Sequence, residues 1–290
     1  MNVEERALVF PCNGSRLYGI LSLPAPAASK GVLIVVGGPQ YRAGSHRQFT
    51  LLARHLAAHG VPALRFDYRG MGDSEGDVRT FEDLGDDLRC AINTFCEEVP
   101  SLNELVIWGL CDAASAAVFY AHEDRRVTGL VLLNPWVRTD QGVATVYLKR
   151  YYVARFFAPE FWKKIWKGHF NYSEAARSLS KIMAEAFTGN QKIASGMDPS
   201  GNVSCPLPPL PERMFDGLSR FKGKLLLIIS GNDLTAQEFS ELVKTSRTWQ
   251  KLLSSPRVSR FNLPEANHTF SRREWRDQVA SWTTAWVRSW

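Results

Sequence analysis

Glu104–Ala114 reads ELVIWGLCDAA, an apolar run followed by Gly-x-Cys-x-Ala and by residues that favour a helix. This pattern predicts a buried strand, a tight turn and a helix, with the thiol of Cys111 presented at the turn. So sharp a turn strains the backbone and needs small neighbours, which Gly109 and Ala113 supply. The first N–H groups of the helix would face the sulfur and stabilise a thiolate. A buried structural cysteine is the alternative for Cys111 taken alone.

The composition is that of a globular protein with reduced cysteines. The chain has 290 residues, 45% hydrophobic and 22% charged, which suits one large α/β domain with an insertion. The first ten residues, MNVEERALVF, lack the apolar stretch of a signal peptide. The five cysteines form no Cys-x-x-Cys pair, so neither a disulfide framework nor a metal site is expected. We therefore expect a cytoplasmic protein that needs no cofactor and no metal.

Short apolar runs alternate with helical patterns along the chain. An Asn13-Gly14 turn between two alternating segments predicts an antiparallel hairpin at the start. The run at 31–36 is continuously apolar, which is typical of a parallel strand covered on both faces. Further strands are expected at residues 62–66, 104–108, 127–133, 224–229 and 258–261, with helices at 46–59, 81–97, 237–252 and from 273. The expected fold class is α/β, with a mostly parallel doubly wound sheet opened by the hairpin.

One segment differs in composition from the rest of the chain. Between Gln141 and Ser195 there are nine Lys/Arg, three Asp/Glu and 11 aromatic residues, whereas the remainder holds 26 basic and 26 acidic residues. We therefore expect an α/β core at residues 1–136 and 222–290, and a helical cap insertion at 137–221 with a Pro- and Gly-rich return segment.

The aromatic and basic side chains of the predicted cap allow three interpretations. They pack the cap onto the core, form an apolar pocket for an acyl chain, or contact an anionic membrane surface. In the third case the protein would lie peripherally at the inner face of the membrane. No recognised nucleic-acid-binding fold surrounds these residues, so a nucleic-acid partner is not expected.

A nucleophilic cysteine needs a base and an acid that orients the base. Parallel sheets collect such groups at the carboxyl ends of their strands. Asp233 follows the strand at 224–229, and His268 follows the run at 258–261. The order nucleophile, acid, histidine predicts a triad of Cys111, Asp233 and His268. The alternatives are a turn-capping role for Asp233 and a helix-flanking role for His268.

Four segments carry a resemblance to known families. They are GGPQYRAGSHRQF (Gly37–Phe49), RFDYRGMGDSEG (Arg65–Gly76), WGLCDAAS (Trp108–Ser115) and SGNDLTAQEF (Ser230–Phe239). The chain resembles the α/β-hydrolase superfamily along most of its length, with the insertion in the usual cap position. A narrower resemblance is to a bacterial family called exosortase A system-associated hydrolase 1. It implies a link to exopolysaccharide and protein-sorting systems.

The chain departs from the α/β-hydrolase pattern at two places. Cysteine replaces the usual serine, and in this the chain is similar to dienelactone hydrolases. Ala113, however, stands where the elbow of those enzymes has a second glycine. The loop after the strand at 31–36 contains Pro39, which has no N–H to offer an oxyanion. The expected oxyanion hole therefore consists of the N–H of Asp112 and that of Gln40 or Gly38, with Gln40 preferred. Loss of one such donor removes about 3 kcal/mol of transition-state stabilisation.

Together these features predict a hydrolase that cleaves an ester or thioester of a small or lipid-like acyl group through a thioester on Cys111. One alternative is an acyltransferase that uses the same triad with an alcohol or amine acceptor. Another is a non-catalytic binding partner in envelope polysaccharide or sorting machinery, with an unreactive Cys111. The sequence specifies neither the acyl chain, the leaving group nor the oligomeric state.

Overall fold

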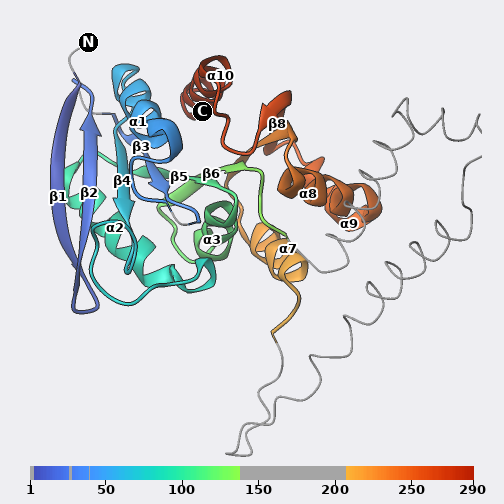
Figure 1. Ribbon diagram of the computed structural model, residues 1–290, viewed down its shortest axis with the longest axis horizontal. Helices are drawn as coiled ribbons and strands as arrows, with labels where there is room; N and C mark the ends of the chain where they lie inside the picture. The colour runs from blue at the N-terminus through green and yellow to red at the C-terminus, as the bar shows by residue number, and fades with distance from the viewer. Residues whose placement is uncertain (1–2, 26–27, 39, 138–206) are drawn as a thin grey trace, which may run out of the picture. The chain divides into compact units, whose positions relative to one another are not determined.

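A computed structural model describes residues 3–25, 28–38, 40–137 and 207–290. The unit that contains the sheet consists of Met1–Val137 and Pro211–Trp290. Its strands are β1 (Glu4–Cys12), β2 (Ser15–Leu23), β3 (Lys30–Val35), β4 (Ala63–Asp67), β5 (Glu104–Leu110), β6 (Val127–Leu133), β7 (Lys224–Asn232) and β8 (Val258–Asn267). They form one sheet in the order β1-β2-β4-β3-β5-β6-β7-β8 (Figure 1).

Pairing within the sheet is antiparallel at one end and parallel elsewhere. β2 pairs antiparallel with β1 and with β4, and every later pair is parallel. Asn13 and Gly14, with φ of 47° and 81°, form the turn of the β1–β2 hairpin, as primed hairpin turns require. All six residues of β3 are buried because helices cover both faces of the sheet. The predicted sheet, mostly parallel and opened by a hairpin, is confirmed.

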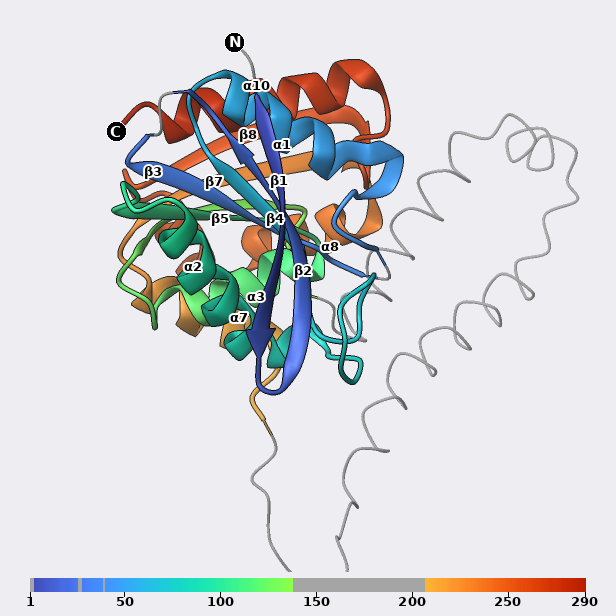
Figure 2. The ribbon, with the colours of Figure 1, turned by 90° about the vertical axis from the view of Figure 1, so that its left-hand side faces the viewer.

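Helices lie on both faces of the sheet. Those described are α1 (Gln48–Ala58), α2 (Gly85–Glu98), α3 (Asp112–Ala121), α7 (Leu210–Arg220), α8 (Leu234–Thr245), α9 (Arg247–Leu253) and α10 (Arg273–Val287), with short 3-10 turns at Ser45–Arg47 and Phe81–Asp83. Figure 2 shows α1 and α10 over one face and α2, α3 and α7 over the other. None of the described helices is long and apolar enough to cross a membrane.

Two predicted elements have different bounds in the structure. The helix expected at 237–252 is two helices, because Ser246 is extended (φ −115°, ψ 114°) and its side chain accepts a free N–H of the first turn of α9, that of Trp249. The last strand was expected to end at 261, yet β8 continues through Pro264 to Asn267. β8 is an edge strand, and a proline is tolerated there because one side of the strand has no hydrogen-bonding neighbour.

The cap predicted at 137–221 lies largely outside the described residues. Of that range, the structure describes the segment from 207 onward, and α7 forms there. Gly217 of α7 packs so closely on Val118 of α3 that a Cβ atom at Gly217 would lie 2.8 Å from the Val118 carbonyl oxygen. The helical pattern of α7 was not recognised in the sequence because Pro208, Pro209 and Pro211 surround its start.

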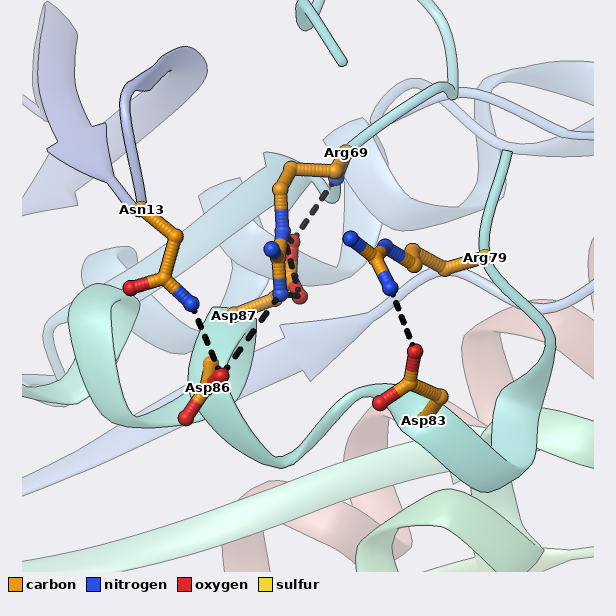
Figure 3. A network of polar contacts seen from close by, with 6 residues as sticks. All are labelled: Asn13, Arg69, Arg79, Asp83, Asp86 and Asp87. Atoms are coloured by element: carbon orange, nitrogen blue, oxygen red, sulfur yellow. Dashed lines mark hydrogen bonds and ion pairs between the residues drawn. The ribbon is translucent and has the colours of Figure 1, made fainter. Parts of the chain in front are cut away.

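A buried ion pair fixes the loop that follows β4 (Figure 3). The backbone N–H of Arg69 donates to Asp87 of α2 at 2.8 Å, and its guanidinium donates to both Asp87 oxygens at 2.7–3.1 Å. Asp87 is fully buried, and Arg69 is 5% exposed. The same view shows Arg79 and Asp83 pairing at 2.6 Å, where the aspartate is 65% exposed.

Replacing Asp87 with alanine should lower the free energy of unfolding by about 3–5 kcal/mol, because the buried Arg69 charge would keep only its 3.9 Å contact with the exposed carboxylate of Asp86. The matched control is Asp83→Asn, which breaks an exposed pair and should change stability by less than about 1 kcal/mol. Urea denaturation of both variants measures the difference. Equal losses for the two variants would contradict the importance assigned to the buried pair.

Candidate active site

The turn between β5 and α3 holds Cys111 in a strained conformation. Its φ of 63° and ψ of −123° lie outside the regions that most residues adopt. Backbone hydrogen bonds hold this geometry: the Cys111 N–H donates to Leu133 at 2.9 Å, and its carbonyl accepts from Ala114 and Trp136. Gly109 must be small, because a Cβ atom there would lie 2.6 Å from the Ala113 carbonyl. The strained turn with small neighbours predicted for this stretch is present.

β7 and β8 bring Asp233 and His268 together. Their register shifts between Ser230 and Asn232, so that Asn232 pairs with Asn267. The shift depends on Gly231, where a Cβ atom would lie 2.1 Å from the Pro264 carbonyl oxygen. Because Asp233 and His268 directly follow the paired asparagines, they leave the sheet side by side. The extension of β8 beyond its predicted end therefore positions the histidine.

His268 lies between a carboxylate and a thiol. Its Nδ1 is 2.9 Å from Asp233 Oδ2, and the Cys111 thiol is close enough to interact with its side chain. These contacts raise the pKa of His268 to about 10, the Asp233 hydrogen bond contributing most and burial opposing it. The imidazolium form is thus favoured at neutral pH. The structure brings together all three members of the predicted triad.

Asp233 also caps α8. Its carboxylate accepts from the backbone N–H groups of Thr235 at 3.4 Å and Ala236 at 3.1 Å. The capping role considered for Asp233 and its contact with His268 therefore coexist. Capping holds the carboxylate in place, and its side chain is 7% exposed.

The raised pKa of His268 predicts a pH dependence of stability. A histidine whose folded pKa exceeds its unfolded value of about 6.5 stabilises the fold fully below that pH. The contribution falls as the pH rises and is lost above about 10. The difference in unfolding free energy between wild type and His268→Gln should therefore shrink between about pH 6 and pH 10. Urea denaturation across this range measures it, and Asp233→Asn should weaken the trend. A difference that stays constant with pH would contradict the raised pKa.

The predicted oxyanion donors lie near the elbow, but each N–H has a partner. The Gly38 N–H donates to both carboxylate oxygens of Asp112 at 2.9 Å. The Gln40 N–H donates to the Gly38 carbonyl at 2.8 Å in a tight turn. The Asp112 N–H is hydrogen-bonded to its own carboxylate. Gly38 has a φ of 59°, a conformation that glycine adopts without strain.

Asn134 helps to hold the loop of His268 in place, a role that was not predicted from the sequence. Asn134 is fully buried at the end of β6. Its side-chain amide donates to Ser230 Oγ at 2.9 Å and to the His268 carbonyl at 3.3 Å, and its oxygen accepts from the Ser230 N–H. A polar residue directly after a buried strand is the signal that would have identified it.

A second unassigned group fixes the loop that carries Gly38 and Gln40. The carboxylate of Asp67 is fully buried and forms an ion pair with Arg42, whose backbone N–H donates to it at 2.5 Å. Arg42 also pairs with Asp73 at 2.6 Å. The loop after β3 is therefore tied to the loop after β4.

Comparison with known proteins identifies the family. The family model described as "Serine aminopeptidase, S33" matches residues 27–191. The chain belongs to this family. It carries cysteine, not serine, at the elbow between β5 and α3.

Curated relatives match a shorter part of the chain. The polyketide transferase grgF of a Penicillium species is 27% identical over 117 residues, 39% of both chains. The polyketide transferase claH of Penicillium crustosum is 29% identical over 133 residues, which cover 44% of this chain and 43% of claH. The chain thus spans about two fifths of the length of the curated relatives it matches.

Solved structures share the fold at low sequence identity. The Pyrococcus furiosus esterase Pf2001 superposes with a TM-score of 0.65 at 17% identity, covering 99% of this chain and 92% of the esterase. Est1E of Butyrivibrio proteoclasticus, solved with ferulic acid, gives 0.60 at 13% identity over 97% and 98% of the two chains. A dienelactone hydrolase of Anabaena variabilis gives 0.60 at 15% identity, with 99% and 97% covered. The chain therefore has the α/β-hydrolase fold.

Proposed function

We propose that this chain is an acyl hydrolase that cleaves an ester or thioester through a thioester formed on Cys111. The observation that supports this most directly is the contact of His268 with both Asp233 and Cys111. An acid, a base and a thiol at the carboxyl ends of β7, β8 and β5 are the parts that nucleophilic acyl transfer requires. Similarity to solved esterases supports the same reaction class through the fold.

The mechanism proceeds in two steps. The Cys111 thiolate attacks the carbonyl carbon of the acyl group, and the His268 imidazolium donates its proton to the departing alcohol or thiol. His268, now neutral, takes a proton from water, which attacks the thioester carbon. The carboxylic acid is released and Cys111 leaves as a thiolate. His268 keeps the proton taken from water and is again an imidazolium. Asp233 keeps the ring oriented and stabilises its positive charge in both steps.

We assign the oxyanion donors to the N–H groups of Asp112 and Gly38. Both face the same carboxylate next to Cys111, which is where an oxyanion would form. Gln40, the preferred candidate on sequence grounds, is less suited because its N–H donates to a backbone carbonyl, that of Gly38, whereas the partner of the Gly38 N–H is a side chain that can rotate away. The side-chain oxygen of Gln40 accepts the Ser45 N–H at 3.1 Å, which supports the loop.

Trapping of the acyl-enzyme tests this function. The protein is mixed with p-nitrophenyl esters and with acyl thioesters of increasing chain length, quenched in acid and analysed by peptide mass spectrometry. One acyl group should appear on the peptide that contains Cys111 and disappear with hydroxylamine. Cys96→Ala serves as the matched thiol control and should retain the adduct. An acyl group on another residue, or turnover with no acyl-enzyme, would argue against Cys111.

An acyltransferase is the second candidate. The observation that favours it is the similarity to two polyketide transferases, grgF and claH. The same thioester would then be attacked by an alcohol or amine instead of water. Adding such acceptors during turnover and measuring acylated product against free acid distinguishes the two activities. Product that does not rise with acceptor concentration favours hydrolysis.

The setting of the reaction is also a proposal. The resemblance to exosortase A system-associated hydrolase 1 links the chain to exopolysaccharide and exosortase systems. In that setting the chain would be a cytoplasmic protein that acts on a lipid-like acyl substrate. The cap predicted at 137–221 would then provide the acyl pocket or the contact with an anionic membrane. Flotation with liposomes tests the membrane contact. If the contact exists, the protein should bind liposomes more strongly when they contain anionic lipid. Equal binding with and without that lipid contradicts it.

A further inference from the structure

The carboxylate of Asp112 is held by backbone N–H groups from two segments of the chain. Gly38 donates to both of its oxygens at 2.9 Å, and Ala113 donates to Oδ1 at 3.0 Å. The N–H of Asp112 itself is a third donor. Three convergent N–H groups, two of them at the start of α3, stabilise a negative charge strongly.

The loop after β3 is shaped around this carboxylate. A Cβ atom at Gly37 would lie 2.4 Å from Asp112 Oδ1, so any larger residue would push the carboxylate out. Burial raises the pKa of Asp112, while the hydrogen bonds and the neighbouring His268 oppose that rise. The negative charge of Asp112 also contributes to the raised pKa of Tyr68, about 12, which is due mainly to burial.

Two of these three donors are the groups assigned above to the oxyanion. A side-chain carboxylate and a tetrahedral oxyanion cannot accept the same N–H groups at once. We propose that the Asp112 carboxylate occupies the oxyanion site of the free protein as an internal anion, and that a substrate carbonyl must displace it before Cys111 reacts. This inference rests on the proposed function and adds an autoinhibitory contact to the same site.

Two consequences follow from such an internal anion. The free protein should react slowly with small esters that have too little binding energy to displace the carboxylate. It should also repel reagents that carry a negative charge next to the reacting carbon. Removal of the carboxylate should reverse the second effect, because the vacated N–H groups would bind an anion.

Alkylation with two matched reagents tests the inference. Iodoacetamide and iodoacetate have similar size, but only iodoacetate is charged. The rate of Cys111 labelling by iodoacetate divided by the rate with iodoacetamide, measured by mass spectrometry, should rise about tenfold from wild type to Asp112→Ala. Asp112→Asn keeps the side-chain shape and should give a smaller rise. Asp216→Asn removes an exposed charge on α7 and should leave the ratio unchanged.

The outcomes separate this inference from the proposed function. An unchanged ratio in both folded Asp112 variants overturns the internal anion, even if Cys111 labels rapidly. Slow labelling at the rate of an ordinary thiol, with a raised ratio, supports the internal anion and contradicts the reactive triad. As a second readout, sodium butyrate should slow labelling of Asp112→Ala but not of wild type. Equal protection of the two proteins overturns the inference.

Discussion

Replacing Cys111 with alanine should abolish hydrolysis of every ester or thioester that the wild-type protein cleaves. The expected loss is about 10⁴-fold or more in kcat, since alanine cannot form the acyl-enzyme. Binding of substrate should change little, because the thiol contributes little contact area. The fold should also persist, since the backbone hydrogen bonds of the elbow do not involve the sulfur.

Initial rates of p-nitrophenyl ester cleavage measure the effect. The near-ultraviolet circular dichroism spectrum checks that the variant is folded. Cys96→Ala is the matched control: Cys96 is a partly exposed free thiol on α2 and contacts Arg126, not the triad. It should retain wild-type kinetics. Residual activity above about 1% in Cys111→Ala would mean that another group is the nucleophile.

Asp233→Asn should lower kcat about 10³–10⁴-fold with little loss of stability. Asparagine caps a helix about as well as aspartate, so the bonds to Thr235 and Ala236 should persist. What disappears is the carboxylate that accepts a hydrogen bond from His268, the largest contributor to its raised pKa, together with the smaller effect of the negative charge. The imidazolium is then less stable, and proton transfer to the leaving group suffers.

A control variant separates catalysis from helix capping. Ser246 caps α9, the helix that follows, and it has no contact with His268 among the hydrogen bonds of the described residues. Ser246→Ala should therefore cost about 1 kcal/mol of unfolding free energy and leave kcat unchanged. If Asp233→Asn behaves like Ser246→Ala, the role of Asp233 is structural and the triad lacks its acid.

The sheet was predictable because buried parallel strands have a simple sequence signal. The run at 127–133 coincides with β6, and the runs in β3 and β5 are matched to within a few residues. Each is mostly apolar, since both of its faces are covered. The elbow at Cys111 was predictable for a related reason: small residues at fixed spacing satisfy a steric demand that only a tight turn imposes.

Details that depend on tertiary contacts were not predictable. Nothing local in the sequence reveals that β8 is an edge strand and can contain Pro264, or that Gly231 allows the register shift beside it. Asn134 meets its partners across 96 and 134 residues of chain. The role of the Asp112 carboxylate was not predictable either, because it accepts the N–H of Gly38, which is 74 residues away in the chain.

The most direct measurement is the pH dependence of Cys111 alkylation by iodoacetamide, compared between wild type and His268→Ala. A reactive Cys111–His268 pair predicts rapid labelling of wild type at and below neutral pH, and loss of that labelling in the variant. Cys96, followed in the same samples, provides an internal reference thiol. Labelling of Cys111 that rises only near the pKa of a free thiol, about 8.5, in both proteins would contradict the proposed nucleophile.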